Sequence, residues 1–393
     1  MSRVVSMALS CLLALSVATG FAVAALAPQR PVSMSYQTLE EVRSLSYIEA
    51  ELAARTRPGV IAVPVLGSSE LGPRSCSSTH PVTLLGDGRY GVSVQGIGRA
   101  FCGNLWQAIE VGALAPALDG PRRVVLIPSI QWFMCYRDPV TAFPAAFSQS
   151  AYDACMRNSS LPSALKERIR ARMAEYGVSR GGPSALDGQL DAIDRRVREA
   201  VGRLRTSVAQ GGGPLPQRGP LADAPDWDAL LSRAQAEAAE KSSGNDLGVY
   251  NGWYAKNLEP WLAGTRAWES QTKRDGYFSD QEFQDFDLLL SVCREAGVEP
   301  LVLIQPVKGA LYDRTVYTRQ VRAGYYDAIR SSCERAGVAV ADFSDREYDP
   351  LFLREYSHPS ALGAAWYSRA IYDFATTGRL RPGVLRAGEG SGR

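Results

Sequence analysis

The sequence predicts an α/β protein: a parallel sheet flanked by helices, with a helical insertion and one transmembrane helix at the N-terminus. Three observations predict it. Short apolar runs end in turn residues, helical stretches precede the later runs, and a long uncharged segment follows Arg3. Continuous apolar runs are typical of strands buried on both faces, and alternation with helices favours parallel pairing through right-handed crossovers.

The first element is residues 4–27, an uncharged run rich in Ala, Leu and Val. About 24 residues of helix span roughly 36 Å, enough to cross the hydrocarbon core of a bilayer. Ala25-Leu26-Ala27 resembles the cleavage site of a signal peptide, which is the alternative, but Pro28 would directly follow the cut. We therefore expect residues 1–27 to be an uncleaved anchor, with the rest of the chain outside the cytoplasm.

The next segment, residues 28–57, is polar and helix-prone, which suits a stalk between the membrane and a globular domain at 58–380. A flexible tail, residues 381–393, is expected to follow that domain. Within the globular domain, Gly297 and Gly337 are each expected to end a helix, in a Cys-x-x-Ala-Gly-Val pattern that occurs twice. Glycine is the usual residue at a left-handed helix cap. Five strands are predicted, at Val60–Leu66, Tyr90–Val94, Arg123–Pro128, Pro300–Gln305 and Val338–Phe343.

Residues from about 150 to 285 have a different character and are interpreted as a helical insertion. Ala164–Tyr176 and Leu190–Arg205 are helical segments, and Gln210–Pro225 is rich in Gly and Pro, as in a linker or surface loop. The ligand of such an α/β domain should bind beyond the carboxyl ends of the strands. The reactive residues are therefore sought where the strands end.

Composition excludes several classes of function. The chain has 393 residues, 46% hydrophobic and 21% charged, with 43 Lys and Arg against 41 Asp and Glu, so no nucleic-acid partner is expected. Its two histidines are not spaced as metal ligands, and we expect no metal. Neither a phosphate-binding loop nor a GxGxxG motif occurs, so no cofactor is predicted.

The cysteines fit an oxidising compartment. Cys11 lies in the apolar run, and an even number remains that could pair as disulfides. Buried free thiols are the alternative, since cysteine is often buried unpaired. The sequence does not choose among the connectivities of Cys76, Cys102, Cys135, Cys155, Cys293 and Cys333.

The most informative stretch is Val65-Leu66-Gly67-Ser68-Ser69-Glu70-Leu71, a buried strand that ends in a small-residue turn. A nucleophilic serine needs this position, because the N–H groups beyond the turn can stabilise an oxyanion. Ser69 would be so placed. The alternative is that Ser68 and Ser69 only cap a helix.

The second stretch is Glu355-Tyr356-Ser357-His358-Pro359, after the last predicted strand. A serine hydroxyl is a weak nucleophile unless an imidazole accepts its proton, and a carboxylate best fixes the tautomer of that imidazole. His358 is the favoured base and Glu355 the acid. His80 is the alternative base, although Pro81 beside it fits a fixed loop equally well.

Together these stretches resemble the DltD family, a branch of the SGNH or GDSL-like hydrolases. Gly67-Ser68-Ser69-Glu70-Leu71 is similar to the family's GSSEL element, and Ile127–Phe133 to a strand that ends in Gln-Trp-Phe. Ile304–Gly309 resembles a Pro-Val-Asn-Gly loop. The likeness runs from about residue 60 to 375 and departs twice: the family's DxxH is ExxH at Glu355, and the loop asparagine is Lys308.

The resemblance implies a flavodoxin-like (SGNH-type) sheet and an N-terminal membrane anchor. Ser69 would be the nucleophile and His358 the base of D-alanine transfer from a D-alanyl donor to lipoteichoic or teichoic acid, outside a single-pass cell-membrane helix. A membrane acyl-channel-like protein of the Dlt system is the implied partner. The alternatives are a cell-surface O-acyl esterase and a non-catalytic, membrane-tethered adaptor of the same machinery.

The oxyanion hole is expected to use the Ser69 N–H, with Gly96 or Gly98 and the Gln131 amide as further donors. No asparagine follows the third strand, and glutamine also has an amide donor, although Gln131 could equally pack against Trp132. Lys308 could contact an anionic polymer or simply be exposed. Expected substrate-binding residues are Ser68, Glu70, Trp132 and Lys308.

Overall fold

A computed structural model describes residues 37, 39–72, 77–100, 102–134, 139–178, 220–264 and 276–380. The helices and strands named below belong to one compact unit, residues 34–180 and 221–393. The expected anchor, residues 1–27, and the expected tail, residues 381–393, lie outside the described residues. In the ranges that are described, no helix is both long and apolar enough to cross a bilayer.

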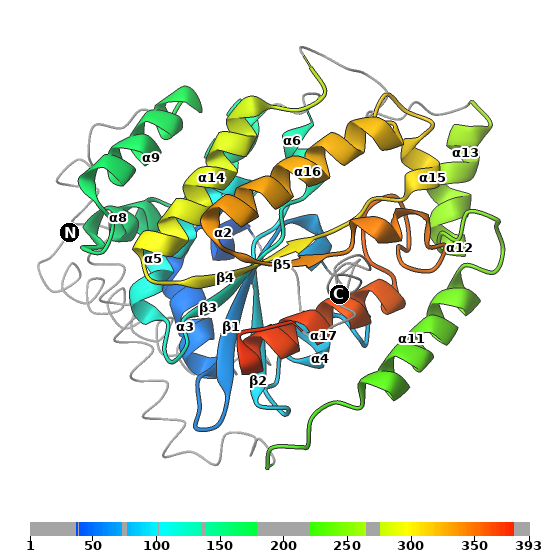
Figure 1. Ribbon diagram of the computed structural model, residues 1–393, viewed down its shortest axis with the longest axis horizontal. Helices are drawn as coiled ribbons and strands as arrows, with labels where there is room; N and C mark the ends of the chain where they lie inside the picture. The colour runs from blue at the N-terminus through cyan, green and yellow to red at the C-terminus, as the bar shows by residue number, and fades with distance from the viewer. Residues whose placement is uncertain are drawn as a thin grey trace, which may run out of the picture. The chain divides into compact units, whose positions relative to one another are not determined.

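The centre of the unit is a sheet of five parallel strands in the order β2-β1-β3-β4-β5 (Figure 1). All five strands predicted from the sequence are confirmed, with ends shifted by a few residues. The chain runs from β1 outward to β2 and then returns to β3 on the other side, so the order switches at β1 and β3. The strands are β1 Ile61–Leu66, β2 Val92–Ile97, β3 Arg123–Leu126, β4 Glu299–Ile304 and β5 Ala339–Asp342.

Both faces of the sheet are covered. Successive strand residues point to opposite faces, so Leu66 and Leu126 face one hydrophobic cluster while Val65 and Val125 face another. The first face packs against α3 (Leu45–Arg55), α5 (Asn104–Leu114), α14 (Asp280–Glu295) and α16 (Arg319–Ala336). The second packs against α4 (Pro81–Leu84) and α17 (Ala361–Thr377), and α11 (Trp227–Lys241) lies on α17 (Figure 1).

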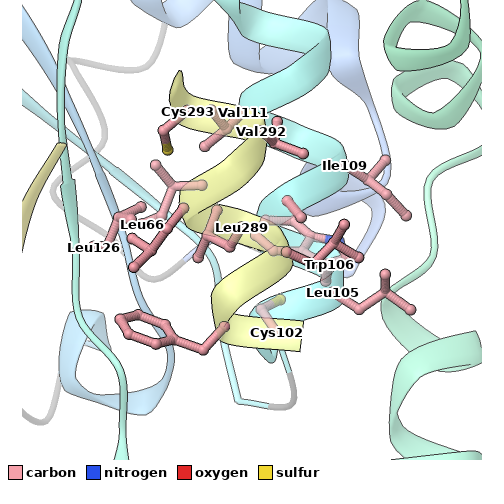
Figure 2. Packing of buried hydrophobic residues seen from close by; sticks show 14 of the residues in the cluster. Leu66, Cys102, Leu105, Trp106, Ile109, Val111, Leu126, Leu289, Val292 and Cys293 are labelled. Carbon is pink, nitrogen blue, oxygen red and sulfur yellow. The ribbon is translucent and has the colours of Figure 1, made fainter. Parts of the chain in front are cut away.

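The first face holds the larger core. Figure 2 shows α5 and α14 side by side, with Leu289 directed toward Leu66 and Leu126 of the sheet and Trp106 on the other side, beside Leu105 and Ile109. α5 is buried along its whole length. Its buried residues include Asn104, Gln107 and Glu110 as well as the apolar side chains, so α5 is a core element rather than a surface helix.

The expected insertion is helical over much of its described part, while residues 220–226 and 242–250 are not helical. The predicted helix Ala164–Tyr176 is confirmed as α9, Ser163–Glu175, whereas Leu190–Arg205 and most of Gln210–Pro225 lie outside the described residues. Arg172 of α9 binds both carboxylate oxygens of Asp285 on α14, at 2.6 and 2.9 Å. This part of the insertion is therefore joined to the core helices.

The remaining elements are α2 Leu39–Val42, α6 Ile130–Phe133, α7 Pro139–Ala146, α8 Gln149–Arg157, α12 Asn251–Trp253, α13 Glu259–Leu262, α15 Gly309–Tyr312, the 3-10 turns η1 Ser69–Leu71, η2 Ala115–Ala117 and η5 Ser344–Tyr348, and the π turn η3 Tyr254–Leu258.

The expectation of a stalk at residues 28–57 is wrong for its second half. α2 and α3 belong to the globular unit, with Val42, Leu45, Ile48 and Leu52 buried in the first-face cluster. These apolar side chains recur at helical spacing and form a stripe that faces the core. The domain therefore begins before residue 58.

The repeated Cys-x-x-Ala-Gly-Val pattern forms equivalent helix ends. Gly297 and Gly337 both have a φ of +65°, the left-handed conformation that favours glycine. Cys293 and Cys333 lie on α14 and α16 over the same face of the sheet. Disulfide pairing is wrong for four of the cysteines, because Cys102, Cys155, Cys293 and Cys333 are buried free thiols; Cys11, Cys76 and Cys135 lie outside the described residues.

Candidate active site

Ser69 lies at the carboxyl end of β1, where the strand order switches. A tight turn holds it there, because the Glu70 carboxylate accepts hydrogen bonds from the backbone N–H of Ser68, at 2.5 Å, and from its hydroxyl, at 2.9 Å. A Cβ on Gly67 would lie 2.4 Å from that same carboxylate, so the turn requires glycine. Ser68 makes no side-chain cap bond to η1 and Glu70 is buried. Both residues shape the turn, rather than being open to substrate as expected.

His358 connects this serine to an acid. Its Nε2 lies 3.0 Å from the Oγ of Ser69, and its Nδ1 lies 2.5 Å from Oε1 of Glu355. The structure thus brings together the three residues that the sequence predicts to act together. A hydrogen-bonded serine, imidazole and carboxylate can activate the hydroxyl for attack on a carbonyl carbon.

Glu355 is nine-tenths buried, and burial by itself would raise its pKa. The charge of His358, the hydrogen bond from its ring and the charge of Arg354 outweigh this effect and hold the pKa of Glu355 below its ordinary value. The backbone N–H of His358 also donates to the carboxylate, at 3.2 Å. The group is therefore a carboxylate at neutral pH, as needed to stabilise an imidazolium.

The loop that carries Glu355 and His358 is fixed by residues that follow β4. Gln305, the first residue after that strand, donates from Nε2 to the carbonyl of Ser357 at 2.7 Å. The backbone N–H of Lys308 donates to the carbonyl of Tyr356 at 2.8 Å. Gln305 is not among the site residues predicted from the sequence. Its position could have indicated the role, because a polar residue directly after a buried strand lies at the edge of a parallel sheet where ligands bind.

Lys308 does not occupy the position expected of a polymer contact. Its side chain is 2% exposed, and its Nζ donates to the backbone carbonyls of Gly248, Pro350 and Leu353, at 3.1, 2.7 and 3.4 Å. Burial lowers the pKa of this ammonium to about 8, although the charge of Asp349 opposes the shift. The expectation of an exposed or polymer-binding lysine is therefore wrong, because the protein itself encloses the ammonium.

His80, the alternative base, is part of the scaffold. Its Nε2 donates to the carbonyl of Glu70, at 3.1 Å, and its Nδ1 accepts from the N–H of Val82, at 3.3 Å, at the start of α4. Burial lowers the pKa of His80 to about 4. Both ring nitrogens are occupied by backbone groups, which favours the fixed-loop interpretation over a proton-transfer role.

The two glycines that are expected to donate to the oxyanion differ in their position relative to β2. Gly96 lies inside β2 opposite Val65, not in the loop beyond the strand, which argues against it. The N–H of Gly98 donates to Oε1 of Gln37, at 2.9 Å, and Gly98 has a φ of +130°. Gln37 is a buried residue of the N-terminal segment that the sequence analysis did not single out.

Gln131 is also engaged within the protein. Its Nε2 donates to the hydroxyl of Tyr312 at 3.1 Å, and its Oε1 accepts from the hydroxyl of Ser129 at 2.5 Å. Trp132 is half-buried and packs against the first-face cluster, and its contact with substrate stays a prediction. Across the described ranges, no three His, Cys, Asp or Glu side chains converge in a way that could hold a metal ion.

Comparison with known proteins gives concordant matches. The family model "DltD protein" matches residues 36–376. Protein DltD of Bacillus subtilis (strain 168) is 24% identical over 333 residues, which cover 81% of this chain and 83% of that protein. Protein DltD of Staphylococcus aureus (strain NCTC 8325 / PS 47) is 22% identical over 322 residues, which cover 78% of this chain and 79% of that protein.

Proposed function

This chain belongs to the DltD family, and from that membership and the Ser69–His358–Glu355 arrangement we propose that it is a serine acyltransferase in the D-alanylation of teichoic acid. The reaction transfers D-alanine from an activated D-alanyl donor to a hydroxyl of lipoteichoic or teichoic acid. The observation that carries the proposal is the 3.0 Å contact between His358 Nε2 and Ser69 Oγ in a chain of this family.

In the first half-reaction, the Oγ of Ser69 attacks the carbonyl carbon of the D-alanyl donor while His358 Nε2 takes the hydroxyl proton. The bond between the acyl carbon and the donor then breaks. The leaving group departs with the proton from His358, and D-alanine remains as an ester on Ser69. Glu355 stabilises the imidazolium that exists between these two proton transfers.

In the second half-reaction, a hydroxyl of the polymer attacks the ester carbonyl and His358 takes its proton. The bond to Ser69 breaks, and the proton returns to Oγ. Water in place of the polymer hydroxyl would make the protein an esterase. The backbone N–H of Ser69 is the proposed oxyanion donor, with Gly98 and Gln131 contributing if their present partners leave.

The proposal places the reaction outside the cytoplasm, with residues 1–27 as a single-pass anchor and a membrane acyl-channel-like protein of the Dlt system supplying the donor. The anchor is motivated by the length of the uncharged N-terminal run. Sequencing the N-terminus of the mature protein tests it. A chain that starts at Pro28 would contradict the anchor and leave the catalytic proposal standing.

The proposal is tested by measuring D-alanine esters in the envelope of a deletion strain complemented with wild-type protein or Ser69→Ala. We expect the Ser69→Ala strain to resemble the deletion strain, and mass spectrometry to find D-alanine on Ser69 of the wild-type protein after brief incubation. Ser243→Ala is a matched control, because that hydroxyl is exposed and donates to the carbonyl of Glu240. Full alanylation with Ser69→Ala would favour a non-catalytic adaptor, and a different acyl group on Ser69 would favour an O-acyl esterase.

A further inference from the structure

Three backbone carbonyls converge on the buried ammonium of Lys308. They belong to two segments that are far apart in the sequence, Gly248 on one side and Pro350 with Leu353 on the other. These three carbonyls and the Nζ of Lys308 are called the carbonyl cage below. An ammonium has three N–H donors and no acceptor, so the cage matches its donors one to one.

The backbone is shaped for this arrangement. Gly248 has a φ of +63°, and a Cβ there would lie 2.2 Å from the carbonyl oxygen of Pro350. Only glycine allows the two main chains to approach so closely in that conformation. The carbonyl oxygens of Gly248 and Pro350 both accept from Nζ of Lys308, at 3.1 and 2.7 Å. Such dipoles repel each other unless a cation lies between them, which is where Nζ is found.

The cage borders the loop with the acid and the base. Pro350 and Leu353 begin the segment that continues to Glu355 and His358, and the N–H of Arg354 donates to the carbonyl of His358 at 3.0 Å. Lys308 is therefore bound to this loop at three places, by its side chain at Pro350 and Leu353 and by its own N–H at Tyr356.

We propose that Lys308 is a positioning residue, whose ammonium fixes the 350–358 loop so that His358 stays within hydrogen-bond distance of Ser69. The inference rests on the proposed function of Ser69. Lys308 touches neither substrate nor reacting atoms and acts only through the loop. The groups that its ammonium binds are the backbone carbonyls of the cage.

The charge of Lys308 in the cage should change with pH. Burial lowers the pKa of Lys308 to about 8, so the amine is increasingly neutral above that pH. A neutral amine has one donor fewer and no charge to hold the carbonyl dipoles together. The titratable and charged groups on the segments around it are Asp246 and Tyr250 beside Gly248, Tyr312 and Asp313 on its own side, and Tyr348, Asp349, Arg354, Glu355, Tyr356 and His358 along the loop.

The test is the rate at which a fluorophosphonate probe labels Ser69, followed by mass spectrometry in the wild type and in Lys308→Met. Methionine keeps the unbranched shape and removes the charge and the donors. We expect labelling to be slower by about 10-fold or more, since about 1.4 kcal/mol of lost positioning is tenfold in rate. Lys166→Met is the control, because Lys166 lies on α9, which packs against α14 and α5, and it should label at the wild-type rate.

The pH dependence of labelling distinguishes positioning of the loop by the Lys308 ammonium from a purely structural role of this residue. The wild-type labelling rate, corrected with Ser69→Ala for background reaction, should fall as pH rises through about 8, and Lys308→Met should show no such fall. The wild-type profile does not depend on the Lys308 variant and stands even if Lys308→Met does not fold. Wild-type labelling that stays level through that range, or Lys308→Met labelling at the wild-type rate, overturns the proposal.

Failure of the proposed function gives a different result. If wild-type Ser69 is not labelled at all, Ser69 is not an activated nucleophile, and hydrogen exchange then tests the cage directly. The amide of Arg354 should exchange at least about 10-fold faster in Lys308→Met than in Lys166→Met, because opening free energies set exchange rates. Equal protection in the two variants would overturn the cage whatever Ser69 does.

Discussion

Oε1 of Glu355 accepts three hydrogen bonds within a four-residue turn, from the ring of His358 at 2.5 Å and from the backbone N–H groups of His358 and Ser357 at 3.2 and 3.4 Å. One oxygen therefore fixes both the ring and the main chain of the base. A glutamate, one methylene longer than an aspartate, thus reaches Nδ1 from within this turn.

Glu355→Gln should keep the shape of this turn and lose the charge that stabilises the imidazolium. In well-studied triads the comparable change costs on the order of 10⁴ in turnover. We expect a smaller loss, about 10² to 10³, with little loss for Glu355→Asp, because a longer glutamate should contribute less than an aspartate. Single-turnover acylation of Ser69 measures it, and Glu295→Gln on the surface of α14 is the control. Full activity in Glu355→Gln would exclude Glu355 as the orienting acid.

His80 should make folding sensitive to mild acid. Its pKa falls from 6.5 to about 4 on burial, so below about pH 6.5 the unfolded chain binds a proton that the native chain does not. The free energy of unfolding should therefore decrease as pH falls from 6.5 to 4, by about 3 kcal/mol at about 1.36 kcal/mol per unit. Urea unfolding of wild type and His80→Gln across this range checks it. Parallel curves for the two proteins would contradict the prediction.

Glu110 should act in the opposite direction. It lies fully buried on α5, and within the described part of the chain neither carboxylate oxygen has a hydrogen-bond partner. Burial, helped by the charge of Glu49, raises its pKa from 4.5 to about 8, so the native state holds a proton that the unfolded state releases above pH 4.5. Stability should fall as pH rises from about 5 to 8, by up to about 5 kcal/mol.

Glu110→Gln resembles the protonated form and should remove this dependence. Its stability relative to wild type should rise steadily between pH 5 and 8, as measured by denaturant midpoints in matched buffers. A constant difference across that range would show that Glu110 does not change its protonation on folding.

Gln37 should slow acylation if Gly98 serves the oxyanion, because its side-chain oxygen occupies that N–H. Gln37→Ala removes a neutral hydrogen bond, worth about 1 kcal/mol, and we expect acylation of Ser69 to be about five-fold faster. Gln107→Ala, on the buried side of α5, controls for general loosening. Slower acylation in Gln37→Ala would show instead that Gln37 holds Gly98 in its working position.

The sequence predicts the sheet well because each strand of a covered parallel sheet is an apolar run that ends in a turn, as Val60–Leu66 does before Gly67. It also predicts the contact of Ser69 with His358, because the ends of parallel strands meet at one edge. It fails for Lys308 and Gln37. Their partners are backbone groups of distant segments, Gly248 and Gly98, and no side-chain pattern records where a main-chain carbonyl or N–H will lie.

The error at α3 has a different cause. Leu45, Ile48 and Leu52 recur at the spacing of a helix face that packs on a core, but the polar composition of residues 28–57 as a whole masks that pattern. The state of the cysteines could not be predicted from the sequence either. Cys293 and Cys333 occupy equivalent helix ends over one face of the sheet, yet each is a free thiol packed among core side chains.

Ser69 and His358 are separated by 289 residues. During synthesis the nucleophile therefore leaves the ribosome early and its base among the last segments of the domain. A prematurely terminated or proteolysed chain that lacks the end of the domain retains Ser69 without a partner to take its proton. Truncated products should consequently be inert toward acyl donors, and reactivity at Ser69 reports that the whole domain has been made and folded.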